Sequence, residues 1–135
     1  MNKKLQDFLS HYQYQPDPIK KDIWIIPNKV NNQYLDDCDG FCLGILYYVL
    51  ANSSLLTFWY LLLFTDTRIY YVVTSNNIGH VVLRHKGLYI DTYSKAWVTK
   101  EQMLSYGHKF HWSRMFFFWQ VALKMLIGKI LVKMK

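Results

Sequence analysis

The apolar positions of this chain fall into short runs separated by polar breaks, and the spacing of these runs predicts a mixture of helices and strands. Residues 3–12 have the pattern of a short helix, and Pro16 and Pro18 then favour an extended connection. Residues 20–35 are predicted to form a loop that is held by apolar side chains at Ile23, Trp24 and Ile26. The first part of the chain is therefore expected to be a helix followed by irregular backbone.

The next apolar run, DDCDGFCLGILYYVL over residues 36–50, predicts a helix with a defined start. Asp37 has the side chain of an N-cap, which makes Cys38 the first helical residue. Gly40 and Gly44 each lower the helix propensity by about 1 kcal/mol relative to alanine. Small residues at this spacing indicate that another element packs closely against the helix.

Four segments rich in β-branched and aromatic residues are predicted to be strands, namely 55–64, 67–75, 79–85 and 88–94. The last two are expected to form a hairpin with a two-residue turn at Lys86-Gly87. Thr99 then begins a capping box with Gln102, which predicts a short helix that ends near Tyr106.

The C-terminal segment, residues 112–135, is predicted to be a basic amphipathic helix, because three polar residues recur in it at near-helical spacing: Gln120, Lys124 and Lys129. Such a helix either packs on the domain formed by residues 1–111, or docks on a membrane surface or a protein partner. A membrane span is the third alternative, and a lysine near its centre would cost about 2.5–3.5 kcal/mol.

Composition narrows the class of protein. A chain of 135 residues with 52% hydrophobic residues is large enough for one domain with a real core. The net charge of +7 is spread along the chain, and no recognisable nucleic-acid module accompanies it, so nucleic-acid binding is not expected. The N-terminal residues lack the apolar stretch of a signal peptide. We therefore expect a cytoplasmic location, with association with a virion or a membrane as the alternative.

A cysteine, a histidine and an aspartate fall where thiol catalysis would need them. A thiolate forms more readily at a helix N-terminus, the position predicted for Cys38. A histidine must then act as general base, and a third group must orient the imidazole. In the predicted hairpin residues 85 and 88 face each other, so Asp91 projects from the same face as His80, one diagonal step away. A turn longer by one residue would move the side chains of one strand to the other face.

The order of these three residues along the chain, cysteine, histidine and then aspartate, is also found in a known family. The stretches DIWIIPNKVNNQYLDDCDGF and GHVVLRHKGLYIDTY resemble the transglutaminase-like cysteine peptidases of bacteria and phages, within the papain-like superfamily. The resemblance covers residues 22–50 and 79–97. It implies that Cys38 is the nucleophile, His80 the general base and Asp91 the orienting acid. It also implies an α+β papain-like fold with the nucleophile helix packed on a small antiparallel sheet.

Two further expectations concern the rest of the site. In papain-like enzymes a side-chain amide upstream of the cysteine completes the oxyanion hole, and Asn32 or Gln33 could supply it here. Trp24 is interpreted as a packing anchor that could also line the substrate cleft. No cofactor is expected.

The expected activity is hydrolysis of an amide bond in a peptide or protein substrate, or transamidation, through a Cys-His-Asp triad and a thioester. Three alternatives stay open at this point. The same two stretches are similar to NlpC/P60 peptidoglycan hydrolases, although Asp39 replaces their serine and the third catalytic position holds an acid. The chain could instead be an inactive structural or interaction protein on a papain-like scaffold. Finally, the two cysteines, Cys38 and Cys42, together with His108 and His111 could bind a structural zinc ion.

Overall fold

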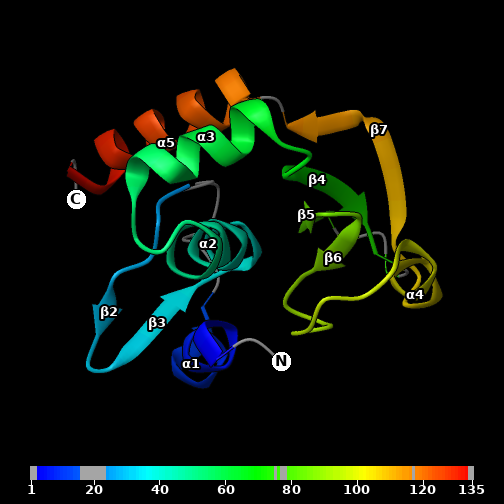
Figure 1. Ribbon diagram of the computed structural model, residues 1–135, viewed down its shortest axis with the longest axis horizontal. Coiled ribbons are helices and arrows are strands. Elements are labelled where there is room, and N and C mark those ends of the chain that lie inside the picture. Colours follow the sequence, from blue (N-terminus) through cyan, green and yellow to red (C-terminus); the bar gives the residue numbers. More distant parts are fainter. Residues whose placement is uncertain (1–2, 16–23, 75, 77–78, 117, 134–135) are drawn as a thin grey trace.

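The computed structural model describes residues 3–15, 24–74, 76, 79–116 and 118–133. Within these ranges the chain is a mixed α+β structure with five α-helices, a three-stranded sheet in the order β1-β3-β2 and an antiparallel four-stranded sheet in the order β6-β5-β4-β7. Figure 1 shows the small sheet and the first two helices on one side of the molecule and the larger sheet on the other. The fold class expected from the sequence is confirmed at this coarse level.

The N-terminal part contains helix α1 and the small sheet. Helix α1 spans Lys3–His11, and strands β1, β2 and β3 span Tyr12–Tyr14, Lys29–Val30 and Gln33–Asp36. Strands β2 and β3 form a hairpin whose two turn residues, Asn31 and Asn32, both have positive φ angles, as a tight hairpin turn requires. The prediction of a loop over residues 20–35 is therefore wrong from Lys29 onward, where the chain forms this hairpin. The connection expected around Pro16 and Pro18 lies outside the described residues.

Helix α2 begins where the sequence predicts. It spans Cys38–Gly44 and continues without a break as the π-helix η1, Ile45–Leu50. The Asp37 side chain accepts a hydrogen bond from the backbone N–H of Gly40, which caps the helix. A Cβ atom added at Gly44 would lie 2.6 Å from the ring of Phe8. The close packing predicted from the small residues of this helix is therefore present.

The larger sheet contains the predicted hairpin. Strands β5 and β6 span Gly79–His85 and Leu88–Ile90, and His85 pairs with Leu88, so the turn has the predicted length. Strand β6 ends at residue 90 rather than 94, and the chain turns over residues 91–95. Strand β4, Arg68–Val73, pairs with β5 on one side and with β7, Lys109–Phe116, on the other. Helix α4, Lys100–Ser105, has the predicted capping box.

The prediction of a strand over residues 55–64 is wrong, because this segment forms helix α3, Leu55–Phe64. The run is almost wholly apolar, and an apolar run without alternation does not distinguish a strand from a helix. The helix is capped by Ser54, whose hydroxyl accepts a hydrogen bond from the backbone N–H of Thr57.

The C-terminal segment is only partly helical. Residues 112–116, predicted to begin the helix, belong to strand β7, and helix α5 spans Phe118–Lys133. Within the described ranges no single helix combines the length and the apolar composition of a membrane span. The pair Cys38–Leu50 and Leu55–Phe64, bent by 107°, passes that test of length and composition when both helices are taken together.

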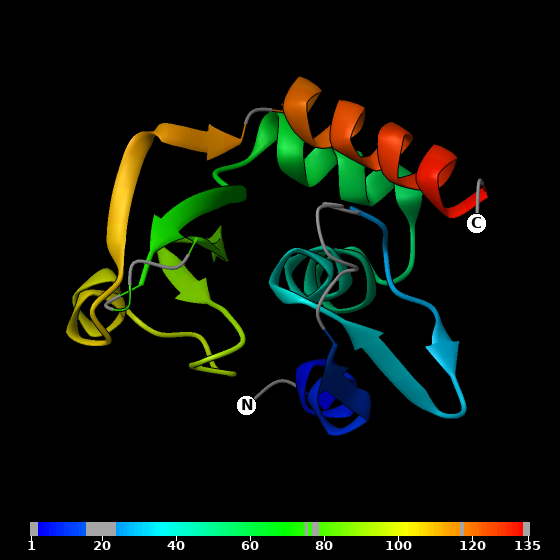
Figure 2. The ribbon, with the colours of Figure 1, turned by 180° about the vertical axis from the view of Figure 1, so that it is seen from behind.

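The main core lies around α2 and η1, which several elements surround (Figures 1 and 2). The side chains of Phe41, Leu43, Ile45 and Leu46 are fully buried. Helix α2 packs on β5, α1 packs on η1, and α3 contacts both η1 and α5. The start of α2 is therefore held at a fixed position beside the larger sheet.

Candidate functional site

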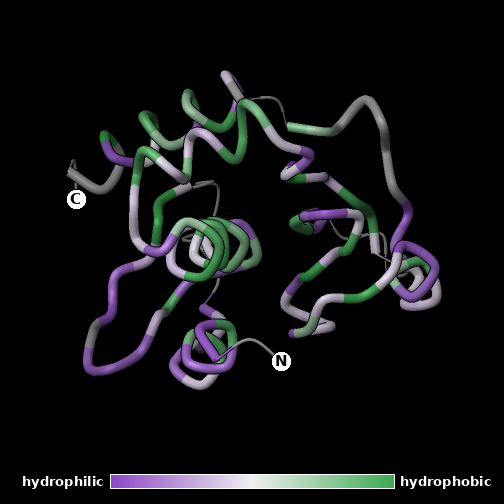
Figure 3. The backbone as a smooth tube through the Cα atoms, viewed as in Figure 1, coloured by the Kyte–Doolittle hydropathy of each residue, from purple (hydrophilic) through white to green (hydrophobic). Residues whose placement is uncertain are grey.

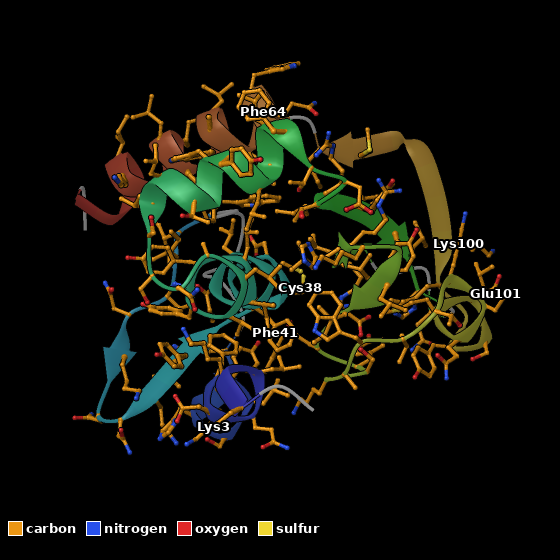
Figure 4. The ribbon with its side chains drawn as sticks, viewed as in Figure 1. Lys3, Cys38, Phe41, Phe64, Lys100 and Glu101 are labelled. Atoms are coloured by element: carbon orange, nitrogen blue, oxygen red, sulfur yellow. The ribbon has the colours of Figure 1, made fainter. Side chains whose placement is uncertain are left out.

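Cys38 lies at the N-terminus of α2, on the side that faces the larger sheet (Figure 4). Its side chain is partly exposed, whereas Cys42, one turn further on, is fully buried. The first N–H groups of a helix have no intrahelical acceptor and favour negative charge nearby. Cys38 therefore lies at the helix end, beside the carboxylates of Asp36, Asp37 and Asp39, whereas Cys42 is enclosed in the core.

His80 and Asp91 form a hydrogen-bonded pair inside the larger sheet. His80 is the second residue of β5, and Asp91 follows the last residue of β6. The His80 Nε2 atom lies 2.9 Å from Asp91 Oδ2, and both side chains are buried. The hairpin register is the reason for this contact, and it is the contact that the sequence predicts.

Asp91 is held as a carboxylate. Its Oδ1 atom accepts hydrogen bonds from the backbone N–H groups of Tyr93 and Ser94. Burial by itself raises the pKa of Asp91, but the hydrogen bonds from His80, Ser94 and His108 outweigh burial and lower the pKa to about 2. An ionised carboxylate only accepts hydrogen bonds, so His80 carries a proton on Nε2, and in the neutral imidazole the lone pair is on Nδ1.

His108, which the sequence suggested only as a zinc ligand, is a member of the site. Its Nε2 atom lies 2.8 Å from Asp91 Oδ2, the same oxygen that accepts from His80, and the His108 side chain is fully buried. His108 directly follows Gly107, whose positive φ of 89° ends the turn after α4. The nearest signal in the sequence is this helix-ending glycine, and it does not indicate which partner the histidine meets.

A cavity of about 350 Å³ opens between α2 and the larger sheet, where it reaches both Cys38 and His80. The aromatic ring of Tyr93 stacks on the imidazole of His80, with 4.7 Å between the ring centroids. The remaining lining residues are Tyr12, Tyr14, Gly79, Thr92 and Lys95. The nucleophile and base expected from the sequence thus meet at one cavity, which β1 also borders.

The other expected site residues lie elsewhere. Asn32 and Gln33 are exposed at the β2–β3 turn, and neither lines the cavity at Cys38. Trp24 is buried, and its ring packs edge-on against Phe116 with 4.9 Å between centroids. It borders a different cavity, beside η1 and α5, so it serves as a packing anchor there.

The geometry also bears on the zinc alternative. The Cys42 Sγ atom donates to the carbonyl of Val81 on β5, and burial raises the pKa of the Cys42 thiol well above its ordinary value. His108 contacts Asp91 instead of a cysteine, and the side chain of His111 lies outside the described residues.

Among the described residues, two groups have ligand atoms within 4.8 Å of one another, as metal binding requires: His80, Asp91 and His108, and separately Asp36, Asp37 and Asp39. Neither group contains a cysteine. A cation at the first group would have to replace the two Nε2 protons that the Asp91 carboxylate now accepts. That group could hold a metal only if His80 lost the proton on Nε2 that it shares with Asp91.

The arrangement is thus a buried carboxylate between two histidines, with one of the histidines opening onto a cavity shared with a helix-terminal cysteine. Comparisons with family models, with curated proteins and with solved structures give no match to this chain.

Proposed function

We propose that this chain is a cysteine-dependent enzyme that cleaves or transfers amide bonds on a papain-like scaffold. The observation that carries the proposal is the hydrogen bond from His80 Nε2 to Asp91, at a cavity that Cys38 also lines. A nucleophile, a base beside it and a third group that orients the base are the three parts of thiol catalysis. The fixed tautomer leaves His80 Nδ1 as the atom that can accept the proton of the thiol.

The reaction would proceed by acyl transfer. The Cys38 thiol gives its proton to His80, and the thiolate sulfur attacks the carbonyl carbon of the amide. The carbon–nitrogen bond then breaks, the amine leaves with the proton from His80, and a thioester to Cys38 remains. His80 next takes a proton from water, or from a second amine, whose attack releases the acyl group and restores the thiol. Water as acceptor gives hydrolysis, and an amine gives transamidation.

The negative charge that develops on the carbonyl oxygen requires hydrogen-bond donors. The backbone N–H of Cys38, at the start of α2, is one candidate. Since Asn32 and Gln33 do not line the cavity, a second donor is sought among the side chains that do. The Tyr12 hydroxyl donates to the carbonyl of Asp36 at 2.7 Å, and the other lining side chains that carry a hydroxyl or ammonium donor are those of Tyr14, Thr92, Tyr93 and Lys95.

The test is alkylation of the native protein by iodoacetamide, with each cysteine followed by mass spectrometry across a range of pH. We expect Cys38 to react at pH values well below the ordinary thiol pKa of about 8.5. His80→Ala should abolish this low-pH reactivity. Cys42 serves as the internal control, because it is buried and its pKa is raised.

The opposite result is equally informative. A Cys38 thiol that reacts only as fast as an ordinary thiol, with no change in His80→Ala, would refute the enzyme proposal. The chain would then be an inactive interaction protein with the same fold. If Cys38 is activated, hydrolysis of cell-wall peptides would favour the NlpC/P60-type activity, and incorporation of a labelled amine into protein would favour transamidation.

A further inference from the structure

Helices α3 and α5 lie side by side along one edge of the molecule and place apolar side chains on their outer surface (Figures 1 and 2). On each helix one apolar stripe is buried in the main core, through Phe58 and Leu62 on α3 and through Val121 and Met125 on α5. The residues on the opposite sides of both helices therefore face away from the core.

These outward residues are themselves apolar and recur at helical spacing. On α3 they are Leu56, Tyr60 and Leu63, and on α5 they are Trp119, Leu123, Leu126 and Ile130. Leu56 is 84% exposed, Trp119 is 63% exposed, and Phe64 at the end of α3 is 70% exposed (Figure 4). We call this set of residues, with Leu55 and Ile127, the α3/α5 face.

This pattern is the reverse of an ordinary surface helix, which turns its charged side to water. Figure 3, which colours the backbone by residue hydropathy, shows hydrophobic stretches in both helices, at both ends of α3 and interrupted by polar residues in α5. One of the polar residues of α5 points inward: the Lys124 ammonium lies over the rings of Trp24 and Phe116, at 5.1 and 5.5 Å. Exposed apolar side chains gathered on two adjacent helices in this way indicate a contact site.

We propose that the α3/α5 face docks onto the surface of an anionic lipid bilayer. Neither helix contains an aspartate or glutamate, and α5 carries an exposed lysine, Lys129, besides the inward-facing Lys124. Basic residues beside an exposed apolar helix face are the combination that binds anionic lipid surfaces. The aromatic side chains of Tyr60 and Trp119 suit the boundary between headgroups and acyl chains.

Charge also favours a lipid bilayer over a second copy of the chain as the binding partner of the α3/α5 face. In a twofold dimer the same surface meets itself, so Lys129 of each copy would meet a surface of α3 and α5 that has no acidic residue. The net charge of +7 would add repulsion between the copies but attraction to anionic lipid. The observations therefore favour the membrane.

The experiment is flotation of the full chain with phosphatidylcholine vesicles that contain, or lack, about one third phosphatidylglycerol. We expect the protein to float with the anionic vesicles and to be released by high salt. The double variant Leu56→Asn, Leu126→Asn should lower the affinity about tenfold or more, since both side chains would lose apolar contact with lipid. The matched control is Leu88→Asn, Leu104→Asn, two exposed leucines on β6 and α4, which should leave binding unchanged.

The charge contribution is tested separately by Lys129→Gln on α5, with Lys109→Gln on β7 as its control. Only the first should weaken binding to anionic vesicles. Three results would overturn the proposal: no binding of the unchanged chain, equal loss in the test and control variants, or self-association in sedimentation that the leucine variant abolishes while no vesicle binding is seen. Circular dichroism of every variant shows whether it is folded. This proposal does not depend on the catalytic one, because none of these residues lines the Cys38 cavity.

Discussion

The replacement Asp91→Asn tests the centre of the candidate site. The buried Asp91 carboxylate accepts from His80 and His108 at Oδ2 and from two backbone N–H groups at Oδ1. An asparagine has one oxygen, and its NH₂ group cannot accept a hydrogen bond. If that oxygen stays on the backbone, the NH₂ group meets His80 Nε2, and the histidine must move its proton to Nδ1. His80 would then lack the lone pair that, in the proposed mechanism, accepts the proton of Cys38.

The magnitude follows from the pKa of Asp91. Hydrogen bonding lowers the pKa from 3.8 to about 2 in spite of burial, and one pKa unit corresponds to about 1.4 kcal/mol, so the ionised form contributes about 2 kcal/mol to the free energy of unfolding. Because the folded-state pKa is the lower one, this contribution is complete above pH 3.8. It is lost as the pH falls from 3.8 to about 2. An asparagine side chain does not titrate, so it makes no such pH-dependent contribution to the free energy of unfolding.

The assay is urea unfolding followed by circular dichroism, at intervals from about pH 7 down to about pH 3. We expect Asp91→Asn to be less stable at neutral pH by at least about 2 kcal/mol, and this difference to shrink below pH 4. Asp7→Asn, at an exposed carboxylate on α1, is the matched control. Equal stability of Asp91→Asn and the unchanged chain at neutral pH, or a difference that is the same at every pH, would refute the reasoning.

Three further replacements extend the test. His108→Ala removes a buried donor to the central carboxylate and should lower the free energy of unfolding by about 2 kcal/mol in urea titrations, and a change within error would contradict the contact. Gly44→Ala should lower the melting temperature even though alanine favours a helix by about 1 kcal/mol, because its Cβ would meet the ring of Phe8; a higher melting temperature would disprove this packing. Tyr93→Leu removes the ring stacked on His80 and should slow iodoacetamide alkylation at the site several-fold, whereas an unchanged rate would leave the ring without a positioning role.

Several parts of the fold and site are set by neighbouring residues, and the sequence alone was sufficient to predict them. The start of α2 depends on the Asp37 cap within one turn of Cys38. The contact between His80 and Asp91 depends on a turn of two residues and on the alternation of side chains along a strand. Both features follow from local geometry, so they can be predicted without knowledge of the rest of the molecule.

Other parts depend on contacts between distant segments, and only the tertiary structure decided them. The apolar run of α3 is compatible with a strand or a helix. In the folded chain it packs beside η1 and α5 as a helix. His108 reaches the carboxylate of Asp91 from a segment 17 residues away, and Tyr12 reaches the cavity because β1 pairs in parallel with β3. The sequence by itself therefore determined the helix that begins at Cys38 and the histidine–aspartate pair. The second histidine, the cavity walls and the outward apolar face were decided by long-range packing, which no local pattern encodes.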